Sequence, residues 1–264
     1  MKELELHLLM LINRSLPTMP GMRYLGSIFE NIYLRKKRLP ISTKIFSYDI
    51  ILNPHESVER ELCFSPQLFD WREIKFFKSI LRPGDIFLDL GCNVGGYSLA
   101  LSNSVGETGN IISVDADYYS TSNLSNTVFK NNISNINVVN IGLSDCNESL
   151  TYTPNMKGNR GGGSFFSEAN NESFNVSCIS LSELLSRFPS VTHIRAAKLD
   201  LEGYEFKVLN QFFIDCTIEL WPEYILIERS VDYIKKTKCD INNLLIQNDY
   251  KLIFNHGMNY IFKK

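Results

Sequence analysis

The stretch FLDLGCNVGGYSLAL, residues 87–101, decides the fold. It opens with a short apolar run that is typical of a buried parallel strand, and a glycine turn then leads into an apolar helix. Gly91 can take backbone angles that are closed to other residues, so a ligand can approach the main chain closely there. Because the helix after the turn also offers free N–H groups, this stretch predicts a ligand site at the end of a strand.

The same alternation of strand and helix continues along the chain. Alternating elements of this kind predict a parallel sheet with helices on both faces, which is a Rossmann-like α/β fold. The chain closes with two apolar runs around His256-Gly257, which predict a hairpin that adds an antiparallel strand to the mostly parallel sheet. The expected strands are 86–90, 110–114, 136–142, 196–199 and 224–228, followed by the hairpin 251–254 and 260–262.

Residues 1–44 stand apart from this pattern as a helical and basic extension, and residues 45–264 form the expected α/β domain. An amphipathic helix is expected at the start, followed by the basic run at 34–38, so the extension either caps the domain or touches an anionic membrane surface. A strand is expected at 44–52. The leucines and isoleucine at helical spacing are Leu4, Leu8, Leu11 and Ile12.

Composition limits the classes of function. The net charge of −2 over 264 residues leaves no broad basic face, so a nucleic acid is not the expected partner. The six cysteines are scattered without zinc-ligand spacing and are expected to be reduced. No secretion signal and no run of roughly 20 apolar residues is present, so a cytoplasmic protein without a transmembrane segment is expected.

Two details of the glycine turn discriminate between cofactors. A dinucleotide fingerprint requires glycine at its first, third and sixth positions, but the third position here is Asn93. The acid Asp89 would repel a pyrophosphate, yet it suits a ligand with an ammonium group. S-adenosylmethionine carries an ammonium group and no phosphate. We therefore expect Asp89 and Gly91 to bind its methionine end, with Asn93 and Gly95 shaping the turn.

The following strand ends supply the other cofactor contacts. Asp115 ends the second strand, where a carboxylate can accept hydrogen bonds from both ribose hydroxyls. Asp117 caps the next helix or contacts water. Ser144 and Asp145 follow the third strand, and each is either an adenine contact or part of an ordinary turn.

The stretch KLDLEGYE, residues 198–205, places Lys198, Asp200 and Glu202 on one side of a strand end. One interpretation is an ion pair of Lys198 with Asp200 and a helix cap by Glu202. The other is a catalytic site of carboxylates, in which Asp200 is a general base, or Asp200 and Glu202 share a divalent Mg²⁺ or Mn²⁺. Glu228 is a candidate third carboxylate, and the alternative bases are His193 and His256.

Together these stretches resemble the FkbM family of methyltransferases. The run 87–97 is similar to its first motif and the run 197–205 to its Lys-x-Asp-x-Glu-Gly-x-Glu motif. The resemblance implies a class I methyltransferase sheet and O-methylation of a hydroxyl on a sugar, glycan or natural product. Asp115-Ala116 departs from the Glu-Pro that is typical of the family at that strand end, so the sugar contact is expected to differ.

Other hypotheses remain open at this point. A nicotinamide-dependent oxidoreductase uses the same fold, and a non-catalytic cofactor-binding scaffold would keep the pocket without the chemistry. The polar, glycine-rich segment 155–175 is either a lid whose Arg160 meets an anionic group of the acceptor or a loop without function. The acceptor's identity and the oligomeric state are not specified by the sequence.

Overall fold

A computed structural model of the chain describes residues 3–15, 17–18, 30, 40–228 and 239–264. Its centre is a seven-stranded sheet in the order β11-β12-β10-β9-β3-β4-β5. The strands are β3 (Ile86–Leu90), β4 (Asn110–Asp115), β5 (Ile136–Asn140), β9 (Ala196–Leu199), β10 (Tyr224–Glu228), β11 (Lys251–His256) and β12 (Asn259–Lys263).

Five adjacent strands of this sheet, β10, β9, β3, β4 and β5, run parallel to one another. Strand β12 pairs antiparallel with both β10 and β11. This confirms the predicted α/β fold, including the antiparallel hairpin at the end of the chain. The strand order reverses direction between β3 and β9, so the loops after these two strands diverge to opposite faces. In open α/β sheets, ligands bind at such a switch point, outside the carboxyl ends of the strands.

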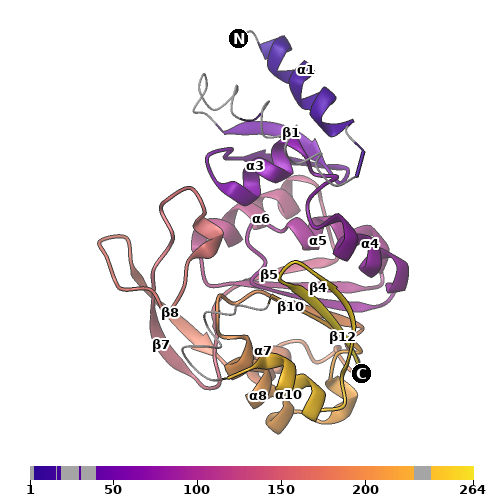
Figure 1. Cartoon of the computed structure of the whole chain (residues 1–264), viewed down its shortest axis with the longest axis vertical. Helices are drawn as coiled ribbons and strands as arrows, with labels where there is room; N and C mark the ends of the chain where they lie inside the picture. The colour runs from indigo at the N-terminus through magenta and orange to yellow at the C-terminus, as the bar shows by residue number, and fades with distance from the viewer. Residues whose placement is uncertain (1–2, 16, 19–29, 31–39, 229–238) are drawn as a thin grey trace.

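Helices cover both faces of the sheet (Figure 1). Successive side chains along β3 point to opposite faces of the sheet, so Phe87 packs into the core on one face and Leu88 and Leu90 pack into the core on the other. On the first face lie α4 (Trp71–Ile80), α5 (Gly96–Val105) and α6 (Tyr118–Lys130), and on the second lie α7 (Leu181–Ser186), α8 (Glu205–Asp215) and α10 (Ile241–Gln247).

The N-terminal helix α1 (Glu3–Arg14) contacts α3 (Ser57–Phe64), and the Arg14 guanidinium donates hydrogen bonds to the Cys63 carbonyl. Met10 and Asn13 are the buried residues near its end, while the expected apolar side is exposed at Leu8, Leu11 and Ile12. The helix was therefore predicted correctly, but not the side of it that packs. The basic run at 34–38 lies outside the described residues. In the part of the chain that the structure describes, no helix combines the length and apolar character needed to cross a bilayer.

The prediction of a single strand at 44–52 is wrong. The segment is instead a hairpin of β1 (Ile41–Ile45) and β2 (Tyr48–Leu52), because Phe46 and Ser47 take left-handed φ values of 48° and 79° and reverse the chain. The expected domain boundary at residue 44 lies within β1.

A second, three-stranded sheet consists of β6 (Gly142–Leu143), β7 (Glu148–Tyr152) and β8 (Phe174–Ile179). The glycine-rich segment 153–173 connects β7 to β8 and includes a short 3-10 turn at Arg160–Gly162. In Figure 1 this small sheet stands beside the carboxyl ends of the central strands, so the segment that it carries can reach the switch point.

Candidate functional site

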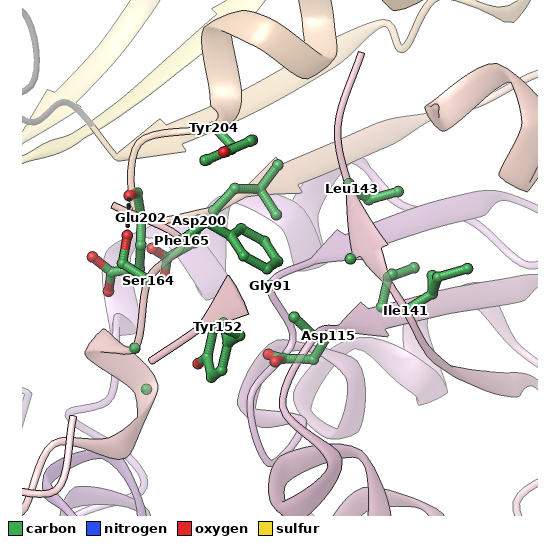
Figure 2. A pocket seen from close by; sticks show the side chains of 16 residues that line it. Gly91, Asp115, Ile141, Leu143, Tyr152, Ser164, Phe165, Asp200, Glu202 and Tyr204 are labelled. Carbon is green, nitrogen blue, oxygen red and sulfur yellow. Dashed lines mark hydrogen bonds between the residues drawn. The ribbon is translucent and has the colours of Figure 1, made fainter. Parts of the chain in front are cut away.

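A cavity of about 450 Å³ lies at the carboxyl ends of β3 and β4, at the predicted switch point (Figure 2). The residues that line it come from the central strand ends, from the small sheet and from the glycine-rich segment. They include Gly91, Asp115, Ile141, Leu143, Tyr152, Gly161, Gly163, Ser164, Phe165, Asp200, Glu202 and Tyr204.

Gly91 brings the ends of β3 and β9 into contact. Its φ is +79°, and a Cβ atom built there would lie 1.8 Å from the carbonyl oxygen of Asp200. The Gly91 and Cys92 N–H groups both donate to the Val114 carbonyl, which fixes the turn against β4. Glycine is therefore the residue that this turn requires, because the Asp200 backbone occupies the space of a side chain, and Gly91 also lines the cavity.

Asp115 lies at the tip of β4 with its carboxylate held from two sides. Its Oδ2 accepts a hydrogen bond from the Asn93 N–H and its Oδ1 one from the Asp117 N–H, both at 2.8 Å. Burial raises the pKa of this carboxyl to about 6. Each oxygen keeps a free lone pair, so the oriented carboxylate can accept hydrogen bonds from two ligand hydroxyls.

Aromatic rings form one wall of the cavity. Tyr152 and Phe165 meet edge to face at 5.5 Å between ring centroids, and Phe165 and Tyr204 at 5.1 Å. Ile141 and Leu143 line the cavity as well (Figure 2). These side chains provide an apolar place for a flat ring, next to the carboxylate of Asp115. Sequence reasoning missed this wall, because its three rings come from segments far apart in the chain.

At the other end of the cavity lie Asp200 and Glu202. The Lys198 ammonium donates to Asp200 Oδ2 at 3.2 Å and to the Gly91 carbonyl at 3.1 Å. Burial alone lowers the pKa of this ammonium, but the carboxylates of Asp200 and Asp89 outweigh it and raise the pKa above its ordinary value. The ion pair of Lys198 with Asp200 is therefore present, and it orients the Asp200 carboxylate beside the cavity.

Glu202 takes a left-handed φ of 50°, and Ser164 Oγ donates to its carbonyl at 3.2 Å (Figure 2). The interpretation of Glu202 as a helix cap is wrong. The N-cap of α8 (Glu205–Asp215) is Tyr204, and no side chain caps this helix. The carboxylate of Glu205 instead accepts hydrogen bonds from the N–H groups of Leu201 at 2.7 Å and Gly203 at 3.1 Å, in the turn before the helix. The strained turn after β9 is thus held in place from α8.

The other residues predicted in the glycine turn do not line the cavity. Asp89 is fully buried, and its Oδ2 accepts hydrogen bonds from the Ser98 N–H at 3.0 Å and the Ser98 hydroxyl at 2.5 Å. Asn93 has a φ of 49° and accepts a hydrogen bond from the Val94 N–H, and Gly95 packs against Leu124. None of these three residues lines the cavity, and the Asn93 side chain lies against Gly161, which does.

Ser144 and Asp145 also lie outside the lining. The Lys207 ammonium contacts Asp145 Oδ1 at 3.0 Å and Ser144 Oγ at 3.4 Å, which orients both side chains towards α8. Their neighbours Gly142 and Leu143 line the cavity instead. His193 is half exposed and pairs with Glu223 at 3.0 Å, so it does not line the cavity either.

The glycine-rich segment covers the cavity through its own backbone. Arg160 does not face an acceptor, because its guanidinium forms a two-point ion pair with Asp117, at 2.5 and 3.1 Å. Asp117 also caps α6 by accepting from the Tyr119 N–H, as predicted. The segment is further tied to α3 by the Ser57 N–H, which donates to the Gly158 carbonyl at 2.8 Å.

A divalent cation at Asp200 and Glu202 finds no support in the donor geometry. The Asp200 carboxylate is already paired with the Lys198 ammonium, whose positive charge would repel a metal ion. Among the described residues, the three-ligand group within mutual reach is Asp145, Cys146 and Glu148, and Lys207 pairs with two of these side chains.

The charge of the lining distinguishes between cofactor classes. Three carboxylates, those of Asp115, Asp200 and Glu202, line the cavity, and no lysine or arginine does so within the described ranges. A pyrophosphate would meet like charge here, whereas a ligand with positive groups, a ribose and a flat base matches the carboxylates and the aromatic wall. The residues present therefore fit S-adenosylmethionine better than a dinucleotide.

The chain matches one protein family and is similar to several solved structures. The family model described as the methyltransferase FkbM domain matches residues 89–252. Among solved structures, the methyltransferase FkbM of Methylobacillus flagellatus KT is 14% identical, with a TM-score of 0.46 over 90% of this chain and 60% of that chain. An S-adenosylmethionine-dependent methyltransferase of Aquifex aeolicus is 15% identical, with a TM-score of 0.41 over 77% of this chain and 89% of that one. Aeropyrum pernix fibrillarin with bound S-adenosyl-L-methionine is 12% identical, with a TM-score of 0.40 over 73% of each chain. No curated protein matches the chain.

Proposed function

The chain belongs to the FkbM family of methyltransferases, and we propose from this premise that it O-methylates a hydroxyl of a sugar, glycan or natural product. The observation that carries the proposal is the acidic, aromatic-walled cavity at the tip of β4, with Asp200 at its edge. When bound, S-adenosylmethionine supplies an electrophilic methyl group, which an acceptor oxygen takes as the sulfur keeps the bonding electrons and leaves as a neutral thioether.

Each residue has a distinct task in this proposal. Asp115 holds the ribose, the wall of Tyr152, Phe165 and Tyr204 holds the base, and the main chain at Gly91 borders the methionine end. Asp89 acts from beneath, because its buried carboxylate fixes Ser98 in the first turn of α5. The assignment of Ser144 and Asp145 to the adenine has no contact in the cavity to support it.

Asp200 removes the proton of the acceptor hydroxyl. Its carboxylate is only partly buried and is oriented by Lys198, so it can accept a proton from a group in the cavity. The Lys198 ammonium stays charged and holds the carboxylate in one position. Glu202 contributes negative charge next to it, which favours a cationic ligand.

Titration calorimetry with S-adenosylmethionine, S-adenosylhomocysteine and NADH tests the cofactor. We expect the first two ligands to bind and NADH not to bind, and the reverse result would favour the oxidoreductase. Asp200→Asn should leave binding of S-adenosylmethionine intact while it lowers methyl transfer by about 10²–10⁴-fold, as the loss of a general base does.

A non-catalytic scaffold makes a different prediction. It would bind S-adenosylmethionine but produce no S-adenosylhomocysteine with any hydroxylated acceptor. It would also be indifferent to Asp200→Asn in every assay.

A further inference from the structure

A second cavity, of about 660 Å³, shares Asp200 with the first. The first cavity extends from Asp200 towards β4 and β5, whereas the second extends towards β10 and the hairpin of β11 and β12. Lys198 and Glu228 also line the second cavity. A ligand in it would therefore share a single carboxylate, that of Asp200, with a ligand in the first cavity.

Glu228 lies directly beside Asp200. The register of the parallel strands β9 and β10 pairs Leu199 with Ile227, so the next residues, Asp200 and Glu228, end neighbouring strands. The two side chains are hydrogen-bonded to each other, and burial together with the charge of Asp200 raises the pKa of Glu228 to about 8. The two acids therefore meet where the two cavities adjoin.

The outer wall of the second cavity is fixed by a buried acid of α4. Glu73 is 1% exposed, and its Oε1 lies 3.3 Å from both His256 Nδ1 and Asn259 Nδ2. These contacts attach the hairpin of β11 and β12 to α4 and leave Met258, in the turn, 59% exposed at the rim. The cavity therefore has a defined wall of hydrogen-bonding side chains.

The charge of the second cavity is negative. The carboxylates of Asp70 and Asp200 line it, beside the carboxyl group of Glu228. Lys198 is its one lysine or arginine among the described residues, and the ammonium is already used by Asp200 and by the Gly91 carbonyl. A phosphate, a carboxylate or a nucleic-acid backbone would meet like charge, while hydroxyl groups find carboxylate, imidazole and amide partners.

We propose that this second cavity binds the methyl acceptor, and that it selects a polyol without anionic groups over a phosphorylated or carboxylated one. The inference rests on the proposed methyl transfer, because it places the acceptor hydroxyl beside Asp200, opposite the methyl donor.

Ligand-observed saturation-transfer NMR in the presence of S-adenosylhomocysteine tests this inference without knowledge of the natural acceptor. The probes are glucose, galactose, mannose and glucosamine at millimolar concentration, each beside its 6-phosphate. Met258→Trp fills the rim of the cavity, and Ile253→Trp, at a 45% exposed position of β11 that does not line it, is the matched control.

The expected result is a signal from at least one unphosphorylated sugar, a weaker one from its phosphate, and loss of the signal in Met258→Trp but not in Ile253→Trp. Stronger binding of the phosphates, a signal unchanged by Met258→Trp, or no signal from any probe would overturn the inference. Calorimetry measures S-adenosylmethionine binding by the same two variants, and we expect both to bind it like the wild type. Loss of sugar binding with intact cofactor binding would concern this inference alone, whereas absence of cofactor binding in the wild type would contradict the proposed function.

Discussion

Replacement of Asp115 by alanine separates cofactor binding from folding. The change removes the acceptors of the Asn93 and Asp117 N–H groups, each at 2.8 Å. Leaving two such donors unpaired costs about 1–3 kcal/mol each, and relief of the buried carboxylate offsets part of it. We therefore expect a net loss of about 1–3 kcal/mol in the free energy of unfolding. The loss of two charge-assisted bonds to the ribose should cost about 2–4 kcal/mol in binding, or about 30- to 1,000-fold in Kd.

Calorimetric titration with S-adenosylmethionine, at a temperature where thermal unfolding shows Asp115→Ala to be folded, measures the second effect alone. Asp85→Ala is the matched control, because the Asp85 carboxylate also accepts a backbone hydrogen bond, from the Arg82 N–H at 2.7 Å, but lies at the opposite end of β3. It should lose stability without loss of affinity. If folded Asp115→Ala bound S-adenosylmethionine within about threefold of the wild type, the placement of the ribose at β4 would be refuted.

Three further perturbations follow from contacts in and around the cavity. Gly91→Ala should lower the free energy of unfolding by roughly 3 kcal/mol or more, because it combines a left-handed φ with a clash against the Asp200 carbonyl; near-normal urea unfolding would contradict this. Arg160→Met should raise amide hydrogen exchange across residues 156–165 by about tenfold or more, since it leaves the buried Asp117 carboxylate without its partner, and unchanged exchange there would show that the ion pair does not hold the segment. Burial raises the pKa of Glu59 from 4.5 to about 7, so its contribution to stability is present below pH 4.5 and is lost as the pH rises through 7. Glu59→Gln should therefore flatten the fall in melting temperature between pH 5 and 7 (~1.4 kcal/mol per pH unit for one proton), and a slope equal to that of the wild type would show that Glu59 is not the group responsible.

The parallel core was predictable because its strands are short apolar runs bounded by turn residues. Apolar side chains that alternate between two cores, as Phe87 and Leu88 do, are compatible with few other folds. The small sheet was missed, although β8 carries a period-two pattern of Phe174, Val176 and Cys178. Its partner β7 reads ESLTY and is polar, and only pairing across a long loop makes it a strand.

Within the candidate site, the residues at strand tips were the predictable ones. Gly91, Asp115, Asp200 and Glu202 all line the cavity, because carboxyl ends of parallel strands meet at one edge of the sheet. The Asp89 carboxylate points towards Ser98, and the spacing of residues along the sequence does not predict that orientation. Contacts between distant segments, such as the aromatic wall, need the folded chain to be seen.

The attachment of the glycine-rich segment to α3 has a kinetic consequence. Its backbone is hydrogen-bonded to Ser57, and Arg160 is paired with Asp117, while Gly161 and Gly163 line the cavity. We expect exchange of the thioether product for fresh donor to require these bonds to break together. We expect product egress, and not the chemical step, to set the turnover number, with S-adenosylhomocysteine acting as a slowly dissociating inhibitor. In such an enzyme the cellular ratio of S-adenosylmethionine to S-adenosylhomocysteine sets the rate of methylation.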